Sequence, residues 1–539
     1  MKKALLFILF LLFTNNLLSQ EKIDKDKLIE DFDYLVQTIE KTHPDPYTSF
    51  GGKIEYHREA YKIKKSLKLN DINMLDYYFL LTSFVSNIHD GHTFISVPEE
   101  VKPSSTRDLT LPLSFKIVTD AIFIDKSLNE NRDLIGSKII SINKITIDDL
   151  LKKVQLFRPC ENEFGAKQEL VQMIKALSTV KYLFSQMKDE LLFTVSTPQG
   201  DEKKVKIKYK SKDDILKKLI SKSTDLIKIK NCLFDYQLIA NNKIGYFVFN
   251  EVFSREVFES IPDNLIETKL KYIYKRYSIY GPRPENNDDA ISKIPSVIES
   301  FSNLLEKMKE NNSTHLVIDL RKNGGGRTPI TVPLLYLLFG DKYFAYNCHA
   351  EYNILISDLY LKKMNMTIEE LNKNWHTNFK IGDYQFGYFW SQDTSLSTYE
   401  RRDAYIQRMQ NAGYTWHEPM LRQEALYTPK VIVITSPYTV SAAFHFMYFL
   451  KYIGNAIIVG TPPRQAGNAF MEITNFKLPN TKWNCSVSNS SQVFFPNDKE
   501  MGKTFQPDIK IKWFDCKKYN FDEHSELLFV IDLIKENRI

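Results

Sequence analysis

Two stretches of this 539-residue chain decide its fold: LVIDLRKNGGG at residues 316–326 and VIVITSPYTVSAAFHF at residues 431–446. Each begins with an apolar, β-branched run that is typical of a buried strand and continues through a sharp turn into a helical pattern. The first turn carries three glycines, Gly324 to Gly326, where backbone N–H groups can point at a ligand. The second presents the hydroxyl of Ser441 where a helix begins. The pattern predicts an α/β fold with an oxyanion-binding loop and a serine nucleophile.

Composition and charge set the outer limits of the interpretation. A hydrophobic content of 43%, with 13% aromatic residues, excludes general disorder and allows two to four domains. The 72 basic and 66 acidic residues leave a net charge of +6. Because the lysines are scattered as doublets and do not form a stripe, we expect no nucleic-acid partner.

The N-terminus, MKKALLFILFLLFTNNLLSQ, has a basic start, an apolar run from Ala4 to Phe13 and small polar residues after it. This order predicts a signal peptide at residues 1–19, cleaved around Ser19 or Gln20. A membrane anchor is the alternative, but ten apolar residues are short for a spanning helix. We therefore expect a periplasmic or secreted protein without a stable membrane span after cleavage. The five cysteines lack CxxC spacing and are interpreted as buried thiols, with room for one disulfide.

After the predicted signal peptide, the chain divides into four stretches of different pattern. Apolar residues recur at intervals of three and four through residues 20–100, which predicts a helical N-terminal segment. Short β-branched runs then alternate with turns at 101–210, and a Lys-rich linker follows at 211–230. Residues 231–539 form the predicted core, in which the Tyr- and Asn-rich stretch 340–428 has no clear period and is interpreted as an insertion or lid.

Ser441 has two interpretations at the start of its helix. An N-cap is the ordinary one, since serine is common there. The other is a nucleophile in the field of the helix N-terminus, with the Ala442 N–H as an oxyanion donor. Gly325 is the second candidate donor, with an ordinary tight turn or a phosphate cradle as alternatives. The Walker and GxGxxG patterns are absent.

A serine nucleophile needs a base, and His92 is the best placed of the ten histidines. It lies in the string Asp90-Gly91-His92-Thr93, at a turn between a predicted helix and a strand. His89 and His445 are rivals. The ring of His445 would project along the helix, since this residue is one turn after Ser441. The sequence has no HExxH or other metal-binding spacing, so we expect no metal and no cofactor.

Several sequence strings together resemble those of one protein family. The strings DGHT, IGYFVF, VIDLRKNGGG and TVSAAF, followed by FKLPNT and QPDIKI, resemble the tail-specific (C-terminal processing) proteases, peptidase family S41. The HPDPY string at residues 43–47 resembles the secreted bacterial branch. The resemblance implies a ClpP/crotonase-like core, a PDZ-like module at 101–210 that takes a peptide end by strand addition, and a peptide or protein substrate.

The resemblance also implies residue roles. Ser441 matches the nucleophile, and Gly325 and Ala442 match the oxyanion donors. One branch of the family draws its base from a lysine shortly after the serine, but VGTPPRQAGNAF at residues 459–470 has no lysine, and the guanidinium of Arg464 stays protonated. The tricorn-like branch uses an N-terminal histidine instead, and His92 matches it.

The tricorn-like branch also implies an acidic residue before the final PDI string, for which Glu500 is the nearest candidate. Two positions depart from the pattern: Gly91 stands where tricorn has a serine, and Phe444 stands where an acidic residue is common.

Together these features predict an exported serine peptidase that works through an acyl-enzyme. The alternative is a catalytically inactive S41-fold protein that binds peptides or acts as a scaffold. A third interpretation, an acyl-CoA enzyme on the related crotonase fold, fits export poorly. Homo-oligomerisation is left open by the sequence.

Overall fold

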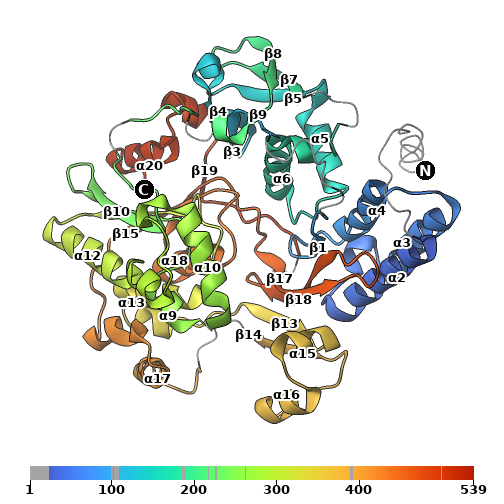
Figure 1. The fold of residues 1–539 in the computed structure, drawn as a ribbon. Helices are drawn as coiled ribbons and strands as arrows, with labels where there is room; N and C mark the ends of the chain where they lie inside the picture. The colour runs from blue at the N-terminus through green and yellow to red at the C-terminus, as the bar shows by residue number, and fades with distance from the viewer. Residues whose placement is uncertain are drawn as a thin grey trace.

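The structure, a computed structural model, describes residues 24–98, 101, 109–184, 189–215, 218–224, 227–261, 263–388, 393–498 and 500–539. The predicted signal peptide lies outside these residues. Figure 1 shows three regions around the centre of the molecule: N-terminal helices, a β-rich module and a larger α/β core.

The N-terminal region is helical, as its apolar spacing predicted. Its elements are α2 (Lys25–Thr42), the 3-10 turn η1 (Thr48–Phe50), α3 (Lys53–Leu69) and α4 (Met74–Ser86). Asp24 caps α2 and Asn73 caps α4, each accepting a backbone N–H of the first turn. The first helix ends at the HPDPY string, because neither proline can continue it. Strand β1 (Phe94–Ile95) follows α4, so His92 lies between a helix and a strand.

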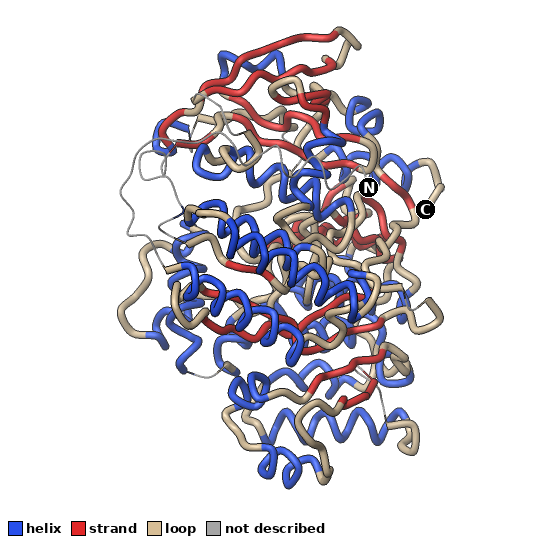
Figure 2. The backbone as a smooth tube through the Cα atoms, turned by 90° about the vertical axis from the view of Figure 1, so that its right-hand side faces the viewer, coloured by secondary structure: helices blue, strands red, loops and turns tan. Residues whose placement is uncertain are grey.

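The β-rich module is an antiparallel sheet covered by helices, with its strands grouped at the top of Figure 2. The strand order is β3-β4-β5-β7-β8, with β6 paired to β5. The strands are β3 (Leu113–Val118), β4 (Ala121–Ser127), β5 (Lys138–Ile142), β6 (Ile145–Thr146), β7 (Glu190–Ser196) and β8 (Glu202–Lys208). The helices are η4 (Asn129–Leu134), α5 (Ile147–Gln155), α6 (Glu163–Lys175) and α7 (Leu177–Val180). A small pair, β2 (Leu109–Thr110) and β9 (Lys210–Ser211), with the short helix α8 (Lys212–Ile215), closes its base.

The core is built on a six-stranded sheet of order β10-β11-β12-β15-β16-β19, parallel from β11 onward. Its strands are β10 (Phe234–Ile239), β11 (Ile244–Phe249), β12 (His315–Asp319), β15 (Lys430–Thr435), β16 (Ile457–Gly460) and β19 (Ile509–Lys510). Both of its faces are covered, as a largely parallel sheet requires.

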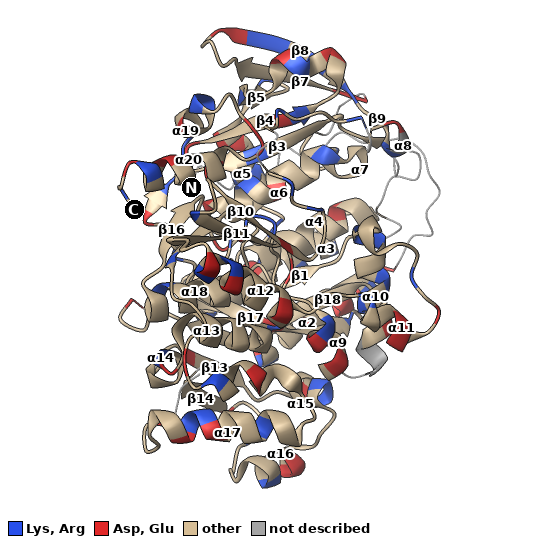
Figure 3. Ribbon diagram, turned by 90° about the vertical axis from the view of Figure 1, so that its left-hand side faces the viewer, with Lys and Arg blue, Asp and Glu red and all other residues tan. Residues whose placement is uncertain are grey.

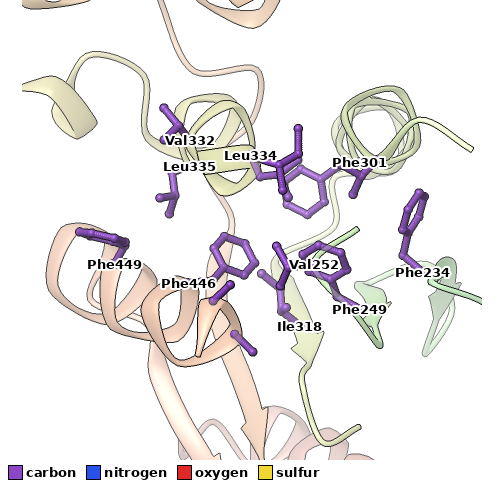
Figure 4. Packing of buried hydrophobic residues seen from close by; sticks show 14 of the residues in the cluster. Phe234, Phe249, Val252, Phe301, Ile318, Val332, Leu334, Leu335, Phe446 and Phe449 are labelled. Atoms are coloured by element: carbon purple, nitrogen blue, oxygen red, sulfur yellow. The ribbon is translucent and has the colours of Figure 1, made fainter. Parts of the chain in front are cut away.

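Alternate strand residues face two different helical layers. Ile318 and Val433 pack against α12 (Val297–Glu310), α13 (Thr331–Phe339) and α18 (Ala442–Gly454), a layer seen from close by in Figure 4. Val317 and Ile432 pack on the other face, against α19 (Trp513–Lys518) and α20 (Ser525–Lys535). Around this frame lie α9 (Arg255–Ser260), α10 (Asp263–Arg276), η5 (Ser278–Tyr280), α11 (Asn287–Ser292) and η6 (Thr328–Ile330).

The stretch 340–428 contains regular elements that the sequence pattern did not predict. They are α14 (Lys342–Ala345), β13 (Glu351–Leu355), α15 (Asp358–Met364), α16 (Ile368–Trp375), β14 (Tyr384–Tyr388), α17 (Thr398–Asn411) and η7 (Thr415–Arg422). Strands β13 and β14 join a second sheet with β1, β17 (Asn468–Lys477) and β18 (Asn484–Val493). The insertion is therefore tied to the same sheet as the strand that follows His92.

The β-rich module is fixed to the core by polar contacts. The ammonium of Lys116 lies 3.2 Å from the Glu526 carboxylate, and the Trp513 indole N–H donates to the Gly136 carbonyl over 2.8 Å. The N–H of Thr119, at the end of β3, donates to the Ile511 carbonyl over 3.0 Å. These contacts place the module beside the carboxyl-terminal part of the core.

The α/β fold class is confirmed, with a helical N-terminal region and β-rich regions; the domain boundaries stay predictions. All five cysteines are buried and free, so the structure forms none of the disulfides that the sequence allowed. None of the helices in the described residues is long and apolar enough to cross a membrane. Acidic and basic residues are interspersed over the ribbon (Figure 3), and several lysines of β8 are paired with carboxylates.

Candidate active site

Ser441 sits on a strained turn between β15 and α18. Its backbone has φ 56° and ψ −129°, a conformation that non-glycine residues adopt only where the surroundings impose it. Two hydrogen bonds fix this turn to the residues that follow β12. The Ser436 hydroxyl donates to the Arg321 carbonyl over 2.6 Å, and the Thr439 hydroxyl donates to the Leu320 carbonyl over 2.9 Å. The Ser441 side chain makes no capping hydrogen bond to α18. The hydroxyl is thus not used as an ordinary N-cap.

The glycine turn packs directly on the serine turn. A Cβ on Gly325, whose φ is 98°, would lie 2.6 Å from the Ser441 Cβ and 3.1 Å from the Ala442 nitrogen. A Cβ on Gly326 would lie 2.3 Å from the Val252 carbonyl oxygen. Both positions require glycine, because side chains there would meet backbone. The structure therefore brings Gly325, Ser441 and Ala442 together.

The two predicted oxyanion donors differ in availability. Within the part of the chain that the structure describes, the Ala442 N–H has no hydrogen-bond acceptor. The Gly325 N–H instead donates to the side-chain oxygen of Asn323 over 2.9 Å. Asn323 is itself buried and held by the Phe249 carbonyl. The Ala442 N–H is thus available to an acceptor, whereas the Gly325 N–H, beside the serine turn, is engaged by Asn323.

His92 is carried by a turn organised around a buried carboxylate. Asp90 accepts the His92 N–H over 2.8 Å, the Thr93 hydroxyl over 2.5 Å and the Ser488 hydroxyl over 2.7 Å. The Nε2 of His43, from the HPDPY string, lies 3.3 Å from the same carboxylate. Burial alone would raise the pKa of Asp90, but its interactions with His43 and His92 outweigh burial and hold that pKa well below its usual range. Asp90 is thus an ionised anchor for the turn.

The His92 imidazole faces two carboxylates. Its Nδ1 lies 3.7 Å from the Asp90 carboxylate and 3.7 Å from Glu161 Oε1, and its side chain is 26% exposed. Burial would lower the pKa of His92, but the attraction of Asp90 and Glu161 prevails and raises it. Burial raises the pKa of Glu161 to about 7, against the opposing effects of His92 and the Ala466 N–H. The imidazole and Glu161 are therefore electrostatically coupled.

One short segment links the His92 region to the serine. The Ser441 N–H donates to the side-chain oxygen of Gln465. The next residue, Ala466, donates its N–H to Glu161 Oε2 over 2.8 Å, and Glu161 is the carboxylate beside His92. His92 and Ser441 thus lie at the two ends of a chain of contacts through Glu161 and residues 465–466.

The remaining candidates lie elsewhere. Glu500 is exposed, and its backbone carbonyl accepts from Asn468 over 3.3 Å. Among the described residues, the carboxylates within 4.0 Å of the His92 ring are those of Asp90 and Glu161, so the structure does not bring Glu500 to His92. His445 is buried along α18 with its Nδ1 2.9 Å from the Thr328 hydroxyl, and burial lowers its pKa to about 4.

Sequence reasoning missed Glu161. It lies in a different module from His92, in the loop between α5 and α6, and belongs to no local motif. One signal was present in the sequence, since the residue directly before His92 is a glycine. A Cβ at Gly91 would lie 3.2 Å from Glu161 Oε1, so the missing side chain leaves room for the carboxylate.

The same cluster could hold a cation by its spacing. Donor atoms of Asp90, His92 and Glu161 all lie within 4.8 Å of one another. Hydrogen bonds also account for these carboxylates without a cation, because Asp90 accepts three of them and Glu161 accepts one. The absence of a metal or cofactor from the reaction stays a prediction.

A serine hydroxyl on a strained strand-to-helix turn lies beside a free helix N-terminal N–H, and contacts through residues 465–466 and Glu161 link it to a histidine backed by carboxylates. These are groups suited to acyl transfer. The fold and the site thus define the class of protein as a hydrolase-like α/β protein.

Comparison with known proteins gives the family. Residues 290–511 match peptidase family S41, and this segment contains both the glycine turn and the serine turn. The fold is similar to crystal structures of CPAF. The CPAF s499a mutant has a TM-score of 0.56 at 13% identity, over 95% of this chain and 98% of that one. Mature CPAF complexed with lactacystin has a TM-score of 0.54 at 13% identity, over 95% and 99%.

The segment 290–511 is thus similar to peptidase family S41, and the fold of the chain is similar to that of CPAF. The family match supports a peptidase, that is, a hydrolase whose substrates are peptides or proteins. No curated protein matches the sequence.

Proposed function

We propose that this protein is an exported serine peptidase in which Ser441 is the nucleophile and His92 is the general base. The observation that carries the proposal is the uncapped Ser441 hydroxyl on a strained turn, packed against Gly325 and beside the free Ala442 N–H. A strained backbone that nothing in helix capping explains is typical of a functional residue.

In the proposed reaction, His92 takes the Ser441 proton as Oγ attacks a peptide carbonyl. The developing oxyanion is held by the Ala442 N–H, and by Gly325 once its N–H is released from Asn323. His92 then protonates the leaving amine, and a water molecule resolves the acyl-enzyme with His92 acting as base. The β-rich module would serve as a PDZ-like site for a peptide end.

Export rests on the basic and apolar N-terminal pattern at residues 1–19. Expression of the full chain with a C-terminal tag, followed by N-terminal sequencing of the product, tests it. Cleavage near Ser19 or Gln20 is the expected result, and an intact Met1 terminus in the product would contradict export by this route.

One observation favours the alternative of an inactive peptide-binding protein. The Gly325 N–H is engaged by Asn323, so the oxyanion site is only half available. One experiment distinguishes the two functions, because a serine peptidase has an activated serine that reacts with a fluorophosphonate and an inactive protein does not.

The experiment is labelling with a fluorophosphonate probe of the wild type and of Ser441→Ala and His92→Ala. We expect labelling of the wild type, none of Ser441→Ala, and a loss of labelling rate on the order of 100-fold or more for His92→Ala. An unlabelled wild type would favour the inactive protein, and equal labelling of Ser441→Ala would show that another residue reacts.

A further inference from the structure

Helix α6 of the β-rich module docks onto the segments on either side of Ser441. Asn162 donates to the Pro463 carbonyl over 3.2 Å, Glu169 lies 3.8 Å from the Arg464 guanidinium, and Gln172 donates to the Tyr438 hydroxyl over 2.7 Å. The backbone at Gly165 also faces Arg464, since a Cβ there would lie 3.8 Å from that of Arg464. These positions recur at helical spacing, so one face of α6 lies against the serine site.

Glu161 stands at the start of this docked helix, directly before its N-cap Asn162. Its side chain is 7% exposed and turns toward the core rather than toward solvent. Oε2 accepts the Ala466 N–H over 2.8 Å, while Oε1 lies 3.7 Å from the Nδ1 of His92. Thus one carboxylate oxygen is fixed to the segment that holds Ser441, and the other faces the proposed base.

The His92 Nδ1 atom is in need of a partner. It is buried and makes no hydrogen bond within the described residues. Burying a ring nitrogen without a hydrogen-bond partner costs free energy. Catalytic hydrogen bonds are often long in ligand-free structures and shorten when substrate binds. A movement of less than about 1 Å would bring Nδ1 and Oε1 into hydrogen-bond range.

Two carboxylates compete for this nitrogen, and their other contacts separate them. Asp90 Oδ1 already accepts the backbone N–H of His92, and Oδ2 accepts the hydroxyls of Thr93 and Ser488. By contrast, Glu161 Oε1 has no other donor within the part of the chain that the structure describes. A Cβ at Gly91 would lie 3.2 Å from Oε1, so the glycine leaves room for this carboxylate.

We propose that Glu161 is the positioning residue for His92: it accepts the Nδ1–H of the imidazole and so leaves Nε2 free to take the proton of Ser441. This inference rests on the proposed serine-peptidase function. A carboxylate at Nδ1 fixes the tautomer and the ring orientation and stabilises the imidazolium that forms during attack. It follows that the β-rich module supplies part of the catalytic site, together with the N-terminal region that carries His92 and the core that carries Ser441.

The test is the kinetics of fluorophosphonate labelling in the full mature chain, comparing wild type with Glu161→Gln, Glu161→Asp and Glu163→Gln. Glu161→Gln keeps the volume and an acceptor for Ala466 but offers Nδ1 an amide. Glu163→Gln is the matched control, since Glu163 is 62% exposed and its ion pair among the described residues is with Lys167 at 3.5 Å.

We expect the maximal labelling rate of Glu161→Gln to fall on the order of 100-fold or more, with the probe concentration at half-maximal rate changing less than about threefold. Glu161→Asp should recover part of that loss, and Glu163→Gln should match the wild type. A purely structural role would not give rescue by the shorter acid.

A second measurement is independent of how well the variants fold. Histidine-selective ¹⁵N NMR of the wild type, with the His92 signal assigned from His92→Gln, should show a neutral ring protonated at Nδ1. A ring protonated at Nε2 would overturn the inference, as would equal labelling rates for Glu161→Gln and Glu163→Gln. If the wild type labels no faster than Ser441→Ala, the proposed function fails, and the inference fails with it.

Discussion

Gly91 and Glu161 fit together as a pair: a Cβ on Gly91 would lie 3.2 Å from the carboxylate oxygen Oε1 of Glu161. Gly91 directly precedes His92, the proposed base, so this fit lies within the site. A side chain at residue 91 would occupy the space into which the Glu161 carboxylate projects.

Gly91→Ala should therefore slow fluorophosphonate labelling on the order of tenfold while leaving the melting temperature within a few degrees of wild type. The methyl group displaces the flexible end of Glu161 by a few tenths of an ångström, which disturbs the base more than the fold. Gly165→Ala is the control, since its nearest new contact is an ordinary 3.5 Å. Unchanged labelling of Gly91→Ala would show that the fit has no bearing on activity.

Gly325→Ala should abolish labelling and destabilise the protein by about 1–3 kcal/mol. Residue 325 has φ 98°, and the added Cβ would lie 2.6 Å from the Ser441 Cβ. Its neighbour Gly324 gives a matched control, because a Cβ there meets nothing within 4 Å. Denaturant unfolding and labelling of both variants check the prediction. Equal behaviour of the two would contradict the close packing of the turns.

The rate of labelling should fall on the acid side at a pH above the ordinary value for histidine. The base works in its neutral form, and although burial opposes it, attraction by Asp90 and Glu161 raises the pKa of His92. Glu161→Gln removes part of that attraction, so its acid limb should move to lower pH. A pH–rate profile of each protein between about pH 5 and 9 measures the acid limb of the wild type and that of Glu161→Gln. A shift to higher pH in Glu161→Gln would contradict this coupling.

Acid should weaken the fold through Asp319, the last residue of β12. Burial would raise the pKa of Asp319, but Arg321 outweighs it and the pKa is lowered to about 2. The stabilisation is therefore complete above the unfolded value near 3.9 and is lost as pH falls toward 2, an effect of about 2 kcal/mol. Unfolding free energies at pH 7 and pH 3 should differ less in Asp319→Asn than in wild type. An equal pH dependence in both proteins would refute the assignment.

The local parts of the site could be predicted from sequence and the long-range parts could not. A strand, a sharp turn and a helix lie consecutively at Ser441, so one window of sequence contains the whole pattern. Glu161 reaches His92 only because α6 docks on the core, and no local pattern encodes that docking. For the same reason β13 and β14 were missed. Glu351 of β13 pairs with Val493 of β18, far along the chain, and β14 joins the sheet only through β13. The mixed Tyr, Asn and Gln composition of the two strands also lacks clear alternation.

The central claim is that Ser441 is a nucleophile. The most direct measurement is peptide mass mapping of the mature wild-type protein after treatment with a fluorophosphonate. The account predicts one phosphonyl group, carried by the peptide that contains Ser441, and no such mass shift in Ser441→Ala. Modification at any other residue, or an unmodified Ser441 in folded protein, would contradict it.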